Sequence, residues 1–143
     1  MAKSQIQKIL VPMDGSKNSF RGLDTAIYLA RQFDATITGL YVVPVYPSFT
    51  VAGLTGSFRS KMTKYAQKFL SDAKTKAAQS GVMFHEKIVS GIAMDYVASY
   101  ANTGNFDLIV LVHRVHSSAW EMFFGSVVNA TVHRSKIPIF VVK

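Results

Sequence analysis

The chain has no cysteine among its 143 residues. Disulfide bonds, thiolate metal sites and thiol nucleophiles are therefore excluded, and several classes of enzyme with them. No apolar run approaches the roughly 20 residues that a membrane-spanning helix needs, and residues 1–8 lack the apolar core of a signal peptide. We expect a soluble, cytoplasmic protein that does not bind membranes.

Acidic residues are also few. Eight Asp and Glu stand against sixteen Lys and Arg, and the net charge of +8 favours anionic partners such as nucleotides or nucleic acid. Six of the basic residues share one predicted helix with a single acidic residue, Asp72. They are Arg59, Lys61, Lys64, Lys68, Lys74 and Lys76. A solvated helix face is the simpler interpretation, and a surface for RNA or DNA is the alternative.

Hydrophobic residues make up 49% of the chain, which is enough for one packed domain over residues 1–143. Apolar runs rich in β-branched residues alternate with amphipathic segments. The runs predict strands at residues 7–13, 35–43, 82–89, 108–112 and 137–142, and the amphipathic segments predict helices at residues 17–33, 57–80, 92–104 and 126–134. Residues 46–56 read as a mobile surface loop. The alternation predicts a Rossmann-like, doubly wound α/β domain with a five-stranded parallel sheet and four helices.

A strand order of 3-2-1-4-5 would reverse the winding between the first and fourth strands. Ligands of such sheets bind at the carboxyl edge at that reversal. The loops that begin at Asp14 and Val112 would then face each other. Gly125 and Ser126 are predicted to open the last helix, where unpaired backbone N–H groups attract anions.

Five short motifs point to a family. They are Ile-Leu-Val-Pro-Met-Asp-Gly-Ser at residues 9–16, Leu-Tyr-Val-Val at 40–43, Asp-Leu-Ile-Val-Leu at 107–111, Gly-Ser-Val at 125–127 and Ile-Pro-Ile-Phe-Val-Val at 137–142. On these motifs the chain resembles the universal stress protein family over essentially its whole length. The nucleotide-binding branch of that family carries G-x-x-G, nine residues, then G-[ST], which holds the phosphates. Aligned on Gly125 and Ser126, the first two glycines fall on Val112 and Val115.

This departure weakens the expected phosphate site, because valine disfavours both positive φ and a close approach of backbone to phosphate. The resemblance implies that Asp14 meets a ribose hydroxyl and that Val42 meets adenine through its backbone. The candidate binding residues are Pro12, Asp14, Val42, Val112, Arg114, Val115, Gly125 and Ser126. For Asp14 the alternative is a turn-forming role, and for Gly125 and Ser126 it is a plain helix cap.

The loop after Val112 carries His113, Arg114 and His116. These cations could replace the lost backbone donors around a phosphate, or they could simply be solvated. Two histidines without a third ligand do not make a metal site, so we expect none. Residues 120–124 are unusually apolar and could pack on the protein, seal a pocket or meet a partner.

No paired carboxylates, nucleophile elbow or P-loop lysine motif is present, so we assign no catalytic residue. The leading hypothesis is a stress-response binding and signalling protein with weak or altered adenine-nucleotide binding. The sequence fixes no cofactor; ATP or AMP are the candidates, with Mg²⁺ only beside a triphosphate. The alternatives are an ATP-binding switch that hydrolyses slowly and a basic accessory protein for RNA or DNA.

The last strand predicts assembly. Residues 137–142 are almost wholly apolar, and in the order 3-2-1-4-5 they form a sheet edge. Such an edge favours pairing with a second copy about a two-fold axis, and the resemblance implies a homodimer through the same strand. The alternative is an edge covered by the chain's own loop.

Overall fold

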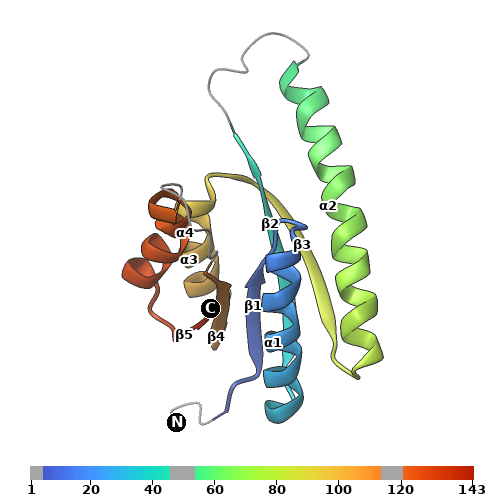
Figure 1. Ribbon diagram of the computed structural model, residues 1–143, viewed down its shortest axis with the longest axis vertical. Helices are drawn as coiled ribbons and strands as arrows, with labels where there is room; N and C mark the ends of the chain where they lie inside the picture. The colour runs from blue at the N-terminus through green and yellow to red at the C-terminus, as the bar shows by residue number, and fades with distance from the viewer. Residues whose placement is uncertain (1–4, 46–53, 114–120) are drawn as a thin grey trace.

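Figure 1 shows the computed structural model of the chain, which describes residues 5–45, 54–113 and 121–143; for residues 54–55 and 121–125 it describes the backbone only. Strands and helices alternate along the chain. They are β1 (Lys8–Pro12), α1 (Lys17–Phe33), β2 (Thr36–Pro44), α2 (Leu54–Gln79), β3 (Phe84–Gly91), α3 (Ala93–Thr103), β4 (Leu108–Val112), α4 (Glu121–Arg134) and β5 (Ile139–Val142).

The five strands form one parallel sheet in the order β3-β2-β1-β4-β5. The predicted doubly wound fold and its strand order are therefore confirmed, with β3 and β5 at the two edges. Because the order reverses at β1, the chain winds in one direction from β1 to β3 and in the other from β4 to β5.

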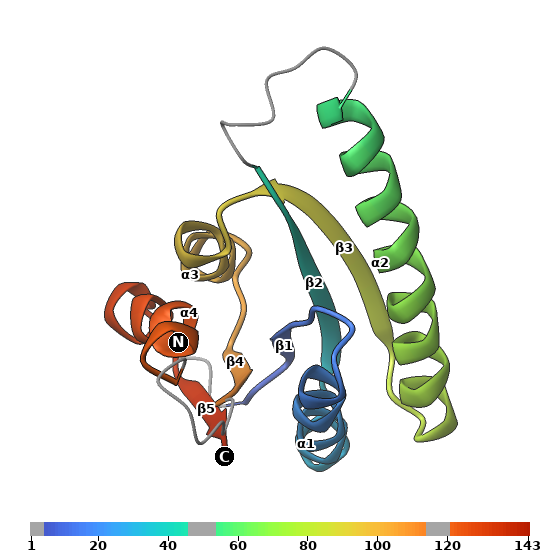
Figure 2. The ribbon, with the colours of Figure 1, turned by 45° about the horizontal axis from the view of Figure 1, so that its top comes forward.

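Helices cover both faces of the sheet, α1 and α2 on one face and α3 and α4 on the other (Figure 2). A hydrophobic layer lies between the sheet and the helices on each face. Successive strand residues point to opposite faces, so Ile9 and Val11 pack in the layer of α1 and α2, whereas Leu10 between them packs in the layer of α3. All three side chains are at most 1% exposed. A strand buried on both faces needs the continuous apolar run that the sequence shows.

Gly39 in the middle of β2 is required by packing. A Cβ atom there would lie 2.2 Å from Cζ of Phe84 on β3 and 3.1 Å from Cδ2 of Leu70 on α2. The absent side chain lets these two large residues meet over the central strand. The sequence analysis treated Gly39 as an ordinary strand residue and missed this role.

Most helix ends lie where the sequence predicts. Ser16 caps α1 by accepting the Ser19 N–H at 3.1 Å. Gly81 ends α2 at a φ of +73°, and the Val82 N–H donates to the Ala77 carbonyl at 2.9 Å, as in a Schellman motif. Of the predicted loop at residues 46–56, residues 46–53 lie outside the described residues, and residues 54–56 already belong to α2.

One predicted boundary is wrong. We expected the last helix to begin at Ser126, but α4 begins at Glu121. Glycine and serine are cap residues, which is why the pair signals a helix start. Residues 121–124 contain no helix breaker, and glutamate is favoured in a first turn by the helix dipole. The helix therefore extends through the glycine and serine.

No helix in the described part of the chain is long and apolar enough to cross a membrane.

Candidate functional site

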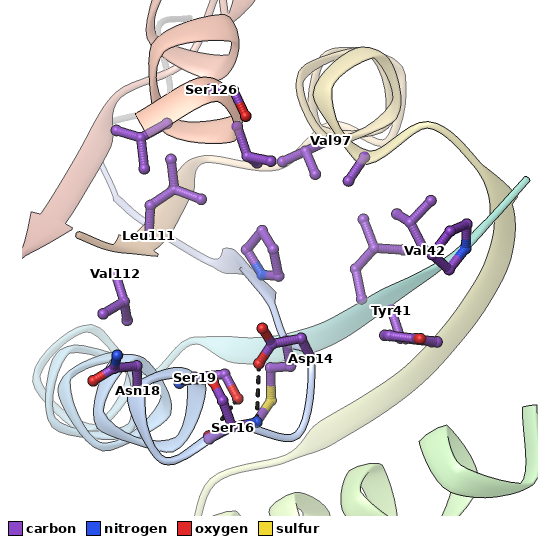
Figure 3. Close-up of a pocket in the computed structure, with 17 residues that line it drawn as sticks. Asp14, Ser16, Asn18, Ser19, Tyr41, Val42, Val97, Leu111, Val112 and Ser126 are labelled. Carbon is purple, nitrogen blue, oxygen red and sulfur yellow. Dashed lines mark hydrogen bonds between the residues drawn. The ribbon is translucent and has the colours of Figure 1, made fainter. Parts of the chain in front are cut away.

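A cavity of about 550 Å³ opens at the carboxyl edge of the sheet, where the winding reverses (Figure 3). The ends of β1, β2 and β4 form its floor, and α1, α3 and α4 form its walls. Its lining residues are Pro12, Met13, Asp14, Ser16, Asn18, Ser19, Leu40, Tyr41, Val42, Pro44, Ala93, Val97, Leu111, Val112, Ser126, Val127 and Val128. The residues around Asp14 and Val112 share one cavity, as the strand order predicts.

Asp14 stands at the mouth of this cavity, in the turn between β1 and α1. Its carboxylate oxygen Oδ1 accepts the Ser16 N–H at 2.9 Å, which is the turn-forming contact of the alternative interpretation. The side chain is also exposed and lines the cavity. Because a carboxylate has about four acceptor sites, the turn contact does not exclude a contact with a ligand hydroxyl.

The turn at Asp14 is held from outside by α2. The Tyr65 hydroxyl donates to the Asp14 carbonyl at 3.3 Å, and Gly15 next to it has a φ of +83°. A Cβ atom on Gly15 would lie only 2.4 Å from the Tyr65 hydroxyl oxygen. Glycine therefore serves twice here, for the left-handed turn and for the approach of Tyr65.

Polar groups gather at the α1 end of the cavity (Figure 3). The Ser19 hydroxyl donates to the Ser16 carbonyl at 2.8 Å. Asn18 accepts from Nη1 of Arg21 at 3.0 Å, and Nη2 of the same guanidinium donates to the Lys143 carbonyl at 2.6 Å. Arg21 thus joins the polar wall of the cavity to the residue that follows β5.

The opposite wall is apolar and comes from β2, α3, β4 and α4. Leu40, Val42, Val97 and Leu111 are each at most 9% exposed and present aliphatic surface to the cavity. The cavity is therefore polar at one end and apolar at the other. A ligand with a flat apolar ring and a hydroxyl-bearing part fits this division of surface.

Val112 lies at the boundary of the polar end, at the last residue of β4. Its side chain is directed to α1, where a Cβ on Gly22 would lie 2.5 Å from Cγ2 of Val112 (Figure 3 labels the valine beside Asn18). The valine therefore occupies space that Gly22 leaves open. The sequence analysis named Val112 but could not see this partner, because the two residues are far apart in the chain.

The contribution expected from Gly125 and Ser126 needs correction. Both residues are interior to α4, since only the first four residues of an α-helix have N–H groups without an intrahelical partner. Gly125 is the fifth residue of α4, so its N–H and that of Ser126 are not available to an anion. Ser126 lines the cavity from within the helix, which is the only part of its predicted role that the structure supports.

Three predicted residues of the phosphate loop cannot be placed. Arg114, Val115 and His116 lie outside the described residues, as does Trp120. His113 is exposed and does not line the cavity; its N–H donates to the Val142 carbonyl at 2.8 Å. Within residues 5–45, 54–113 and 121–143, no three His, Asp or Glu side chains lie close enough to share a metal ion.

Several lining residues escaped the sequence analysis. Asn18 and Ser19 come from the first turn of α1, Val97 from α3, and Val127 and Val128 from α4. Helical periodicity predicts only that the three valines pack in the core. The folded chain shows that they also border the cavity. The position of Asn18 directly after the Asp14 turn is the one signal that could have indicated it.

The basic residues of α2 divide into two groups. Lys76 pairs with Asp24 of α1 at 2.7 Å, which ties the two helices together. Lys61, Lys64 and Lys68 are exposed and three or four residues apart, so they share one side of the helix. Arg59 and Lys74 are exposed as well. These exposed residues are the ones that an anionic partner could reach.

Comparison with known proteins identifies the family to which the chain is similar. Residues 5–143 match the model of the universal stress protein family. A universal stress protein of Methanocaldococcus jannaschii is 31% identical over 140 residues, which cover 96% of this chain and 82% of that protein. A solved universal stress protein in complex with cAMP has a similar fold, with a TM-score of 0.77 at 24% identity over 98% of this chain and 99% of that chain. The universal stress protein from Archaeoglobus fulgidus in complex with dAMP gives a TM-score of 0.73 at 19% identity over 96% of this chain and 98% of that chain. The chain therefore belongs to the universal stress protein family.

Proposed function

We propose that the protein is a stress-response binding protein that holds an adenine-containing ligand in the cavity at the sheet reversal. The observation that carries this proposal is that Asp14 and Val42 line the same cavity. These are the two residues that the family resemblance assigns to ribose and adenine. Structures of similar fold are described as complexes with cAMP and dAMP, which supports an adenine ligand.

Binding of phosphates is expected to be weak. Valine replaces glycine at position 112, and the N–H groups of Gly125 and Ser126 lie inside α4. AMP and ATP are both candidate ligands, and Mg²⁺ would accompany only a triphosphate. Weak binding of the triphosphate also argues for a binding and signalling role over slow ATP hydrolysis, and we propose that this role is cytoplasmic.

We propose no catalytic step. Asp14 is the only carboxylate among the described residues that line the cavity, and these lining residues include no histidine or lysine. Acid–base catalysis needs a second group within hydrogen-bond reach of the reacting atom. Asp14 is accordingly a binding residue.

Substitution of Asp14 tests the proposal by calorimetric titration with AMP. Asp14→Ala should weaken AMP binding by roughly ten- to a hundredfold, since a hydrogen bond to a charged group contributes about 1.5–3 kcal/mol. Asp14→Asn keeps an oxygen for the Ser16 N–H and should lose less, because a neutral acceptor forms a weaker bond. Asp24 of α1 pairs with Lys76 and does not line the cavity, so Asp24→Asn is the matched control and should bind AMP as the wild type does.

Two outcomes would count against the proposal: an AMP affinity that Asp14→Ala leaves unchanged, or no binding of any adenine ligand at millimolar concentration. A short RNA titrated at two salt concentrations examines the nucleic-acid alternative. RNA binding that weakens steeply with salt and is lost on replacing Lys61, Lys64 and Lys68 with glutamine would favour that alternative, because phosphate contacts release counterions.

We also propose a homodimer through β5. Phe140 on this edge strand is 43% exposed, and its neighbours Ile139 and Val141 are only partly buried. The Pro138 carbonyl accepts the N–H of Ile109 in β4 at 3.0 Å, and the Val142 carbonyl accepts the N–H of His113, the residue after β4, at 2.8 Å. Backbone groups alternate in direction along a parallel strand, so the Val141 N–H points away from β4 and toward the open edge.

Replacing Val141 therefore tests the dimer without disturbing the pairing of β5 with β4. We expect the wild type to sediment as a dimer at micromolar concentration and Val141→Pro to sediment as a folded monomer, because proline removes the outward N–H and is tolerated on edge strands. Val141→Thr keeps that N–H and is the control, which should remain dimeric. A monomeric wild type would refute the proposal.

A further inference from the structure

We infer that Tyr65 of α2 is a positioning residue for the ligand: its hydroxyl holds the backbone of the turn at Asp14 and thereby directs the Asp14 carboxylate into the cavity. The inference rests on the proposed function and adds to it a residue outside the cavity wall. Tyr65 is not one of the lining residues, and none of the five sequence motifs contains it. The turn, the packing of the tyrosine ring and its exposure each support this role.

The turn that carries Asp14 is short, and both of its ends are fixed. At one end the Met13 N–H donates to the Leu40 carbonyl at 2.8 Å, which continues the pairing of β1 with β2. At the other end Ser16 caps α1. Asp14 and Gly15 lie between these ends, and Gly15 has a φ of +83°. The direction of the Asp14 side chain therefore depends on the dihedral angles of these two residues.

Two hydrogen bonds act on different groups of Asp14. Its carboxylate oxygen Oδ1 accepts the Ser16 N–H at 2.9 Å, which Figure 3 draws as a dashed line. Its carbonyl oxygen accepts the Tyr65 hydroxyl at 3.3 Å. The bond to Tyr65 restrains the peptide group after Asp14 and uses no acceptor site of the carboxylate, so it orients the side chain without competing with a ligand.

The Tyr65 ring has its own support and does not depend on the turn for its place. It packs edge-on against Phe69 of the same helix, with ring centroids 5.2 Å apart, and Phe69 packs in the same way against Tyr41 of β2 at 5.4 Å. Phe69 is buried, and so is Tyr41, which lines the cavity. Gly15 permits the approach of this row of rings, because a Cβ atom there would lie 2.9 Å from Cδ2 of Phe69. The row therefore places the hydroxyl beside the turn.

The exposure of Tyr65 separates positioning from stability. The residue is 46% exposed, and Asp14 is exposed as well. Water can replace the hydroxyl at the Asp14 carbonyl, and Tyr65→Phe keeps the ring contacts, so we expect this variant to be folded and close to the wild type in stability. The Asp14 carboxylate would then occupy its binding orientation for less of the time, and the affinity for a ligand would fall by the same fraction.

Titration with AMP tests the inference in a double-mutant cycle, followed by NMR so that weak binding is measured. Tyr65→Phe should raise the AMP dissociation constant roughly three- to tenfold, the range that the loss of one neutral hydrogen bond allows. In an Asp14→Ala background the same substitution should change it by less than about twofold, since no carboxylate is left to direct. Tyr28→Phe on α1 is the matched control. Tyr28 is 63% exposed and does not line the cavity, so this variant should bind AMP as the wild type does.

A second cycle changes the ligand and leaves Asp14 in place. Dideoxy-AMP lacks both ribose hydroxyls, which are the groups that the carboxylate would bind. The wild type and Tyr65→Phe should therefore have equal affinities for dideoxy-AMP, although their affinities for AMP differ. A tyrosine that only stabilised the fold would alter the binding of both ligands alike.

Urea unfolding establishes that each variant is folded. An AMP affinity that Tyr65→Phe leaves unchanged would overturn the inference and leave the proposed function standing. An equal loss of affinity with and without the Asp14 carboxylate, or for both ligands, would show that Tyr65 acts on the fold as a whole, and it would also overturn the inference. If the wild type binds no adenine ligand, the proposed function fails and this inference fails with it.

Discussion

Gly39→Val is expected to leave the protein largely unfolded. Even the Cβ of alanine would lie 2.2 Å from Cζ of Phe84 and 3.0 Å from its Cε2, in a strand paired on both sides. Overpacking of this kind costs about 1–3 kcal/mol or more for each added group, and valine adds two further methyl groups. Because a small domain is stable by only about 5–15 kcal/mol, urea unfolding should show a large loss for Gly39→Ala and little folded Gly39→Val.

Two further variants make this expectation specific. Phe84→Leu removes the Cζ and Cε2 atoms that would clash, so Gly39→Ala should cost less in that background than in the wild type. Gly56→Ala is the control on α2, where a Cβ would meet nothing within 4 Å, and it should raise stability by up to about 1 kcal/mol through helix propensity. A Gly39→Ala variant as stable as the wild type would show that the sheet adjusts and that the glycine is dispensable.

The second large effect is expected at Gly22, and its sign depends on residue 112. In the wild type, Gly22→Ala should destabilise the protein by about 1–2 kcal/mol, although alanine is the better helix former, since its Cβ would meet Val112 at 2.5 Å. In a Val112→Ala background the clash is gone, and the same substitution should stabilise by up to about 1 kcal/mol. Urea unfolding of the four proteins would measure a coupling energy of about 2 kcal/mol.

The reversal of sign is the diagnostic outcome. Gly56→Ala, made in both backgrounds, should have the same effect in each, because residue 56 lies at the start of α2 and residue 22 within α1. If Gly22→Ala has the same effect with valine and with alanine at position 112, the two residues are not coupled, and the account of the cavity boundary given above is wrong.

The fold could be predicted because its signals are local. The apolar run around Leu10 and the amphipathic pattern of residues 17–33 each determine one element, and alternation of such elements leaves few topologies. Most element bounds then differ from the prediction by one to three residues. The start of α4 was missed because a local cap signal at Gly125 and Ser126 competes with residues 121–124, whose types continue a helix equally well.

The candidate site could be predicted only in part. Asp14, Val42 and Ser126 were brought to the cavity by the strand order and the family motifs. Asn18 and Val97 were not, because their place in the wall depends on how helices pack across the sheet, which no short motif encodes. The contact between Gly22 and Val112 is likewise non-local, and a glycine inside a helix predicts only reduced helix stability until its neighbour is known.

Arg21 has a consequence for how the cavity and the edge strand would influence each other. One guanidinium bonds both Asn18 in the cavity wall and the Lys143 carbonyl beyond β5. The same side chain thus contacts the wall of the proposed binding site and the residue next to the proposed dimer edge. Thermodynamic linkage makes any coupling between ligand binding and dimer formation reciprocal. Whatever factor a ligand applies to the dimer dissociation constant, dimer formation must apply to the dissociation constant of that ligand.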